Sequence, residues 1–107
     1  MSGAALLSVT FPDRATAARI ARQVVEERLA ACANLTDCLS IYRWENAVEQ
    51  ADETLATFKT LPARAPALAA RIAALHPYDL PAIEWITAEA PGAVKRWISE
   101  AVSTYPS

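Results

Sequence analysis

The stretch that decides the fold is residues 31–60, which has the sequence ACANLTDCLSIYRWENAVEQADETLATFKT. From Ala31 to Trp44 the side chains alternate with period two, which is typical of a β-strand. A second alternating run follows Glu45-Asn46-Ala47 and ends at Thr60. Its charged start, residues 49–53, must stay solvated or paired. The stretch therefore predicts a β-hairpin of two long strands with its turn at residues 45–47.

A strand and a helix are predicted before the hairpin. Residues 5–11 alternate in polarity and indicate a strand that is buried on at least one face. Asp13 follows as a possible N-cap. Apolar residues at spacings of three and four then predict an amphipathic helix from Arg14 to Arg28.

A helix, a strand and a last helix are predicted after the hairpin. Two prolines place the start of the second helix, and Pro77 ends it at His76, because the residue before a proline avoids the helical conformation. A strand over residues 82–87 follows, and residues 91–92 open the third helix. This helix has the cleanest apolar stripe in the chain: Val94, Trp97, Ile98, Ala101, Val102 and Tyr105.

The predicted order is β-α-β-β-α-β followed by a helix, which is the split βαβ arrangement. We therefore predict an α+β, ferredoxin-like fold in which two helices pack on one face of a four-stranded antiparallel sheet. The chain has 107 residues, of which 53% are hydrophobic, and it is expected to form a single domain over residues 1–107.

The predicted hairpin is longer than the helices that could cover it. A strand from Ala31 to Trp44 spans about 46 Å, whereas a helix of about fifteen residues spans about 22 Å. Tyr42 and Trp44 near the tip are residue types enriched at interfaces. Either the hairpin bends back onto its own sheet, or its overhang extends the sheet of a neighbouring subunit.

The balanced charge and the lack of a recognisable targeting signal predict a cytoplasmic protein without a nucleic-acid or membrane partner. The chain has 10 Lys and Arg against 12 Asp and Glu, for a net charge of -2. Its first residues lack the features of a signal peptide. If Cys32 and Cys38 lie on one strand, they are roughly 20 Å apart. That separation is beyond disulfide reach, so both are expected to be free thiols.

Residue types argue against several kinds of chemistry. Phosphate-cradling loops need several glycines, and Gly3 and Gly92 are the only two. The chain has one histidine and no nucleophile-elbow motif, so an acyl-transfer device is not expected. The two cysteines are spaced too widely for a paired-cysteine zinc motif. We therefore expect a binding protein rather than an enzyme.

The segment His76-Pro77-Tyr78 lies between the second helix and the last strand. His76 is either a capping or surface residue, or a ligand that the rigid loop presents at a cleft together with Tyr78. Lys59 is either a sheet-edge charge or part of a site. Cys32 is either a small buried side chain or a ligand.

Six segments resemble the CutA divalent-cation tolerance proteins in order and spacing, over nearly the whole chain. The specific part is LAACAN followed by Y-x-W-E and H-P-Y-x-x-P. The matching segments are Val9-Thr10-Phe11-Pro12-Asp13 with Ala15-Thr16-Ala17, Arg28-Leu29-Ala30-Ala31-Cys32-Ala33-Asn34, Tyr42-Arg43-Trp44-Glu45, Phe58-Lys59-Thr60, His76-Pro77-Tyr78-Asp79-Leu80-Pro81, and Trp97.

The resemblance implies a ferredoxin-like homotrimer with interlocking hairpins, similar to PII-type proteins, and a link to tolerance of copper and other divalent metals. It implies no firmly assigned reaction. The copper ligands associated with the family, a cysteine and two adjacent histidines, match Val9, Leu75 and His76. This sequence keeps only His76 as a metal ligand, so binding of Cu(II) or another divalent metal is expected to be weak.

Three functions follow from these residues. The first is a trimeric metal-responsive binding protein that uses His76, with Cys32 or a carboxylate such as Glu84, at a cleft between subunits. The second is a PII-like sensor of a small anionic metabolite. The third is an enzyme with His76 as general acid–base, for which no nucleophile is visible. Trp44 is expected to pack and Glu45 to be solvated unless they join the ligand site. The residues proposed for that site are Lys59, His76, Tyr78, Cys32, Trp44 and Glu45.

Overall fold

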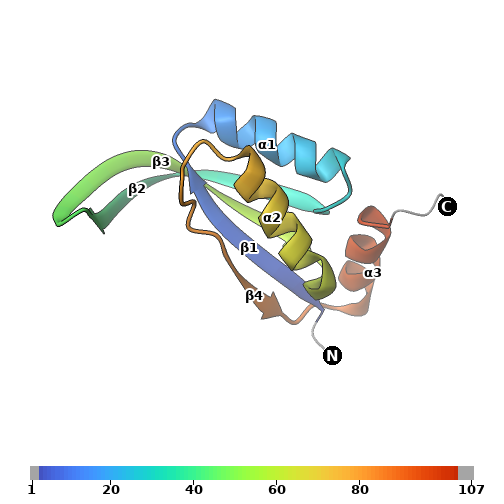
Figure 1. The fold of residues 1–107 in the computed structure, drawn as a ribbon. Coiled ribbons are helices and arrows are strands. Elements are labelled where there is room, and N and C mark those ends of the chain that lie inside the picture. The colour runs from blue at the N-terminus through green and yellow to red at the C-terminus, as the bar shows by residue number, and fades with distance from the viewer. Residues whose placement is uncertain (1–2, 104–107) are drawn as a thin grey trace.

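The computed structural model describes residues 3–103 and has the predicted order of elements (Figure 1). Neighbouring strands pair antiparallel in the order β2-β3-β1-β4. This α+β arrangement confirms the ferredoxin-like fold. The elements are β1 (Ala4–Phe11), α1 (Arg14–Glu26), β2 (Cys32–Trp44), β3 (Ala47–Thr60), the short 3₁₀ helix η1 (Pro62–Arg64), α2 (Ala65–Leu75), β4 (Glu84–Ala88) and α3 (Gly92–Ala101).

The hydrophobic core lies between one face of the sheet and the helices α1 and α2 (Figure 1). Alternate residues of β1 and β3 face these helices, so that Leu7 lies opposite Phe58 and Val9 lies opposite Ala56. All of these side chains are fully or almost fully buried. The helices contribute the matching apolar faces: Ala17, Ile20, Ala21, Val24, Leu68 and Ile72.

Some element boundaries differ from the predicted ones. Helix α1 ends at Glu26 because Arg28 has a φ of 63°, a left-handed conformation that closes a helix. Strand β4 begins at Glu84 rather than at residue 82, since a turn over residues 81–83 precedes it. Helix α2 does stop where Pro77 predicts, with His76 as an extended cap.

The apolar stripe of α3 is only partly covered. Ile98 and Val102 are buried, whereas Val94 is 39% and Trp97 is 46% exposed. The predicted continuation of the stripe at Tyr105 lies outside the described residues. Trp97, which belongs to the predicted apolar stripe, is therefore not packed as such a stripe would predict within the described chain.

The hairpin runs beyond the rest of the sheet (Figure 1). The last pair between β1 and β3 is Phe11 with Thr54, so no described strand pairs as a third neighbour with residues 38–53. We call residues 38–53 the arm. The arm does not fold back onto its own sheet, and the molecule measures 49 × 25 × 21 Å. Its large apolar side chains are exposed: Leu39, Ile41, Tyr42, Trp44 and Val48.

The turn at the tip of the arm has two residues rather than three. Trp44 pairs with Ala47, and Glu45 and Asn46 have φ values of 49° and 68°. Two consecutive positive φ values are typical of a type I′ turn, whose twist matches that of the two strands. The prediction that Ala47 belongs to the turn is therefore wrong.

Candidate functional site

His76 is buried between the end of β1 and the loop that follows α2, with 8% of its surface exposed. Its Nε2 lies 2.8 Å from the carbonyl oxygen of Thr10, and its Nδ1 accepts a hydrogen bond from the backbone N–H of Tyr78 at 3.1 Å. A carbonyl oxygen only accepts and a backbone N–H only donates. The ring is therefore neutral and carries its proton on Nε2.

Two aromatic rings contact the imidazole. The His76 ring stacks on Phe11, with 4.6 Å between centroids and 16° between planes. The tilted ring of Tyr78 lies 4.8 Å away. Of the two predicted alternatives for His76, this environment is that of a capping residue, since a ligand at a cleft would expose a ring nitrogen.

Tyr78 contacts both His76 and the root of the arm. Its hydroxyl donates a hydrogen bond of 2.5 Å to Oε2 of Glu53, a residue of β3 that is 9% exposed. Burial, together with this carboxylate, raises the pKa of Tyr78 above its usual value. The charged start of the return strand is thus paired at Glu53. We call His76, Tyr78 and Glu53 the clasp.

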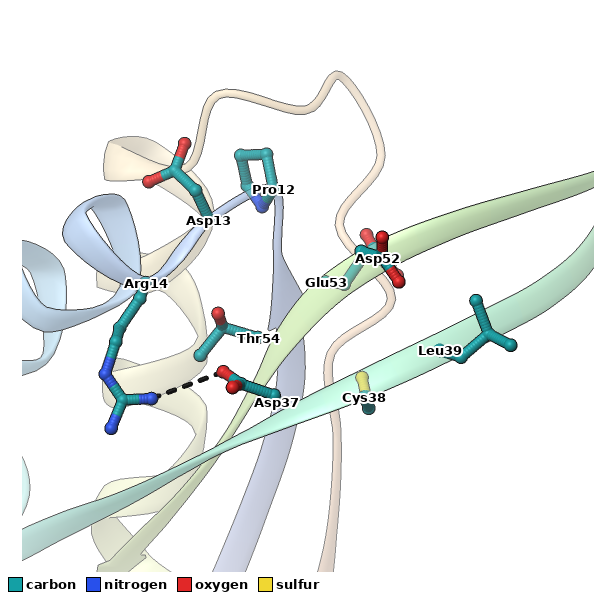
Figure 2. Close-up of a pocket in the computed structure, with 9 residues that line it drawn as sticks. All are labelled: Pro12, Asp13, Arg14, Asp37, Cys38, Leu39, Asp52, Glu53 and Thr54. Carbon is teal, nitrogen blue, oxygen red and sulfur yellow. Dashed lines mark hydrogen bonds and ion pairs between the residues drawn. The ribbon is translucent and has the colours of Figure 1, made fainter.

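Glu53 also lines an open pocket of about 510 Å³ at the root of the arm (Figure 2). The lining carries four carboxylates and one thiol against a single guanidinium. Such a surface attracts cations and repels anions. The lining residues are Pro12, Asp13, Arg14, Asp37, Cys38, Leu39, Asp52, Glu53 and Thr54.

Besides Glu53, which accepts the Tyr78 hydroxyl, two of the pocket carboxylates have partners in the chain. Asp13 caps α1 by accepting a hydrogen bond from the backbone N–H of Thr16 at 2.7 Å, which lowers the pKa of Asp13. Asp37 forms an exposed ion pair of 3.3 Å with Arg14 (Figure 2). Asp52 is exposed on β3 and is open to an added cation.

This pocket was not predicted from the sequence. Its two walls come from different strands, and the length of the tip turn decides which residues face one another. With the predicted three-residue turn, Cys38 would lie opposite Thr54. With the observed two-residue turn it lies opposite Glu53. Asp37 and the acidic pair Asp52-Glu53 are the signal that could have indicated the pocket.

Cys32 and Lys59 lie together at the other end of the hairpin. They are directly opposite one another on β2 and β3, and both are half-buried. Cys32 is therefore not the fully buried side chain that one alternative predicted. Cys32 and Cys38 are free thiols on one strand, as predicted.

Trp44 and Glu45 lie at the tip of the arm, far from the other candidates. Trp44 is 51% exposed, so the expectation that it packs is wrong within a single chain. Glu45 is exposed, as expected. Trp44 lies twelve positions beyond Cys32 on β2, a separation of about 40 Å along an extended strand. The proposed site residues thus form three separate pairs, which only another chain could bring together.

Residues 3–103 contain no group of three or more His, Cys, Asp or Glu side chains that could hold a metal ion. Val9 and Leu75, which match copper ligands in the resemblance, have no atom that donates to a metal. Glu84 lies on the edge strand β4 and is exposed. The described part of the chain therefore does not fit a multidentate Cu(II) or Zn(II) site.

Comparisons with known proteins agree with this fold. The family model for the CutA1 divalent ion tolerance protein matches residues 5–101. The divalent-cation tolerance protein CutA of Thermus thermophilus is 46% identical over 76 residues, which cover 70% of this chain and 74% of that protein. Its counterpart from Pyrococcus horikoshii is 41% identical over 78 residues, which cover 73% and 76%.

A solved structure extends the likeness to nearly the whole chain. It is that of the periplasmic divalent cation tolerance protein CutA from Archaeoglobus fulgidus, which has a TM-score of 0.91 and 31% identity over 94% of this chain and 99% of that one. Within residues 3–103 we find no helix that is long and apolar enough to cross a membrane. A cytoplasmic location for this chain stays a prediction.

Proposed function

The chain belongs to the CutA1 family of divalent ion tolerance proteins, and from this premise we propose that it acts in divalent-cation tolerance as a homotrimer that binds cations at clefts between its subunits. The single observation that carries the proposal is the uncovered arm. Five large apolar side chains of the arm are between 44% and 65% exposed. A two-stranded ribbon is marginal in water, and exposed apolar surface of this kind marks an interface.

A second apolar surface lies at the opposite edge of the sheet. Strand β4 is the edge strand there, and β2 is the edge strand on the side of the arm. Residues 80–86, which we call the β4 surface, include Leu80 at 73%, Trp85 at 43% and Ile86 at 64% exposure. An extended strand can add to a free sheet edge through backbone hydrogen bonds. The arm of one subunit is therefore proposed to extend the sheet of the next at β4.

Two different surfaces that join head to tail generate a closed ring when the rotation between subunits closes. The trimer that the family resemblance implies is such a ring. In it, every arm and every β4 surface is covered, whereas a dimer formed through a single arm-to-β4 contact would leave one of each exposed. Head-to-tail pairing also takes the tip residues Trp44 and Glu45 to a neighbouring subunit.

Cation binding is proposed for the pocket at the root of the arm, next to the neighbouring subunit. Its carboxylates and Cys38 are of the ligand types that divalent cations use, but the described residues of one subunit supply no complete set. We therefore expect modest affinity for Cu(II) or another divalent cation, with ligands contributed from more than one chain.

The alternative function, a PII-like sensor of an anionic metabolite, has less support. The pocket has four carboxylates and one Arg side chain, which disfavours an anion. Lys59, the expected anion-binding residue, pairs with Cys32 at the far end of the hairpin rather than with His76 and Tyr78.

Calorimetric titration of the purified protein with Cu(II), Zn(II) and a panel of nucleotides tests the function. We expect saturable, chelator-reversible binding of a divalent cation and no saturable binding of nucleotides. Asp52→Asn should weaken the cation binding several-fold, whereas Glu89→Gln, an exposed acid outside the pocket, should not. Saturable binding of nucleotides alone would contradict the proposal in favour of the sensor.

A further inference from the structure

The disagreement between the family's copper ligands and the surroundings of His76 has a structural consequence. We infer that His76 does not bind a metal in this protein, but instead acts as a neutral positioning residue that fastens the loop before β4 to the end of β1 and, through Tyr78, to the root of the arm. This inference concerns contacts within one chain and does not depend on the proposed trimer.

The first step concerns the nitrogen lone pairs. A metal binds imidazole through a nitrogen that carries a free lone pair. The Nδ1 lone pair of His76 accepts the N–H of Tyr78, and Nε2 carries the proton that is donated to the Thr10 carbonyl oxygen. Coordination at either nitrogen would break one of these hydrogen bonds and leave a backbone polar group without its His76 partner.

The second step concerns access and additional ligands. The ring is 8% exposed and is stacked on Phe11 within the hydrophobic core, which leaves little room for a hydrated cation. The carboxylate linked to His76 through Tyr78 is that of Glu53, which already accepts the Tyr78 hydroxyl. Within residues 3–103, no metal-binding group of three side chains includes His76.

The contacts of the clasp join three elements of the fold. Thr10 precedes the last residue of β1, and His76 caps the end of α2. Glu53 lies on β3 at the point where the arm joins the rest of the sheet. The clasp therefore fixes three elements relative to one another at the point where the arm leaves the sheet. The loop that it holds leads into residues 80–86, the β4 surface.

Histidine-detected NMR tests the inference directly, because His76 is the only histidine in the chain. Long-range ¹H–¹⁵N spectra of the wild-type protein near pH 7.5 should show the tautomer protonated on Nε2. The same spectra should not change on addition of equimolar Zn(II), which is diamagnetic. A Zn(II)-dependent shift of either ring nitrogen would overturn the inference.

Substitutions provide the second measurement. His76→Ala should lower the thermal midpoint by several degrees, while the dissociation constants for Zn(II) and Cu(II) should stay within about twofold of the wild-type values. Tyr78→Phe keeps the backbone N–H and removes only the link to Glu53, so it should preserve the Nε2 tautomer. Loss of metal binding in a folded His76→Ala protein would contradict the inference. If that variant does not fold, the wild-type NMR titration decides.

Discussion

One pair of strands forms two regions of opposite character. At the root of the hairpin, Ala56 and Phe58 are 0% exposed beneath α1 and α2. In the arm, Ile41 and Val48 are 65% and 64% exposed. Both regions have the same antiparallel pairing, so the difference lies in what covers them. Helices of 13 and 11 residues cover the root and do not reach the arm. The chain completes one apolar core at the root and leaves the large apolar side chains of the arm exposed. We propose that another copy of the chain covers them.

The largest effect is expected from opening the core at the root. Phe58→Ala should destabilise the subunit by about 3–5 kcal/mol, because it removes a fully buried ring and leaves a cavity. The free energy of unfolding of the chain, measured by denaturant titration, gives this loss. Thr57→Ala, at the half-buried neighbouring position on the other face of β3, is the control and should cost much less. Equal losses of stability in the two variants would contradict the claim that the core lies on the helix-covered face of β3.

In the arm, substitution should act on assembly rather than on the subunit fold. Trp44→Ala should weaken subunit association by about 2–4 kcal/mol, as expected for a large aromatic side chain at a packed interface. The dissociation midpoint from sedimentation at several concentrations measures the change. Trp97→Ala is the control, because it removes an indole of similar exposure that lies outside the arm and the β4 surface. Unchanged assembly and melting temperature in Trp44→Ala would mean that this side chain is merely exposed.

The clasp between the two regions predicts a loss of stability in alkali. The raised pKa of Tyr78 means that the folded chain holds the phenol proton more tightly than the unfolded chain does. The resulting stabilisation is fully present below the unfolded pKa of about 10 and is lost as the pH rises through that value toward the higher folded pKa.

Denaturant midpoints of wild type and Tyr78→Phe between pH 8 and pH 11.5 measure this effect. The wild-type midpoint should fall more steeply with pH than that of the variant. Tyr42→Phe, which removes a phenol from the arm, is the matched control. Parallel profiles for wild type and Tyr78→Phe would show that folding does not raise the pKa of Tyr78.

The smallest effect is expected at the tip turn. Glu45 and Asn46 both adopt positive φ, and the type I′ turn prefers Asn followed by Gly. The double variant Glu45→Asn, Asn46→Gly should stabilise the arm by about 1 kcal/mol, because left-handed backbone is costly for other residues. Amide hydrogen exchange across residues 40–51 should slow, while exchange at the root stays unchanged. Faster exchange in the arm would show that the turn is not of this type.

The elements could be predicted from the sequence because their signals are local. The period of the apolar residues marks α1 and β1, and Pro77 fixes the end of α2 at His76. Even the overhang follows from lengths alone. The one-residue error in the tip turn arose because positive φ at Glu45 and Asn46 carries no strong signal when neither residue is glycine.

The contacts of the candidate site could not be predicted, since they depend on partners far apart in the chain. His76 is joined to a backbone carbonyl 66 residues away, at Thr10. A backbone acceptor has no sequence signature, so the sequence left the capping and ligand alternatives for His76 open, and the metal role came from the family resemblance. To predict that Glu53 lies opposite Cys38, one needs the correct register of the two strands. To predict the hydrogen bond between Tyr78 and Glu53, one needs the path of the loop that carries Tyr78.

Sedimentation equilibrium of the wild-type protein at micromolar concentration tests the central claim most directly, namely that another copy of the chain completes the arm. The subunit has a mass of 11.6 kDa. We predict a single species of three subunits with no detectable folded monomer. A folded species of 11.6 kDa under the same conditions would contradict it, because the arm would then be stable in water without a partner.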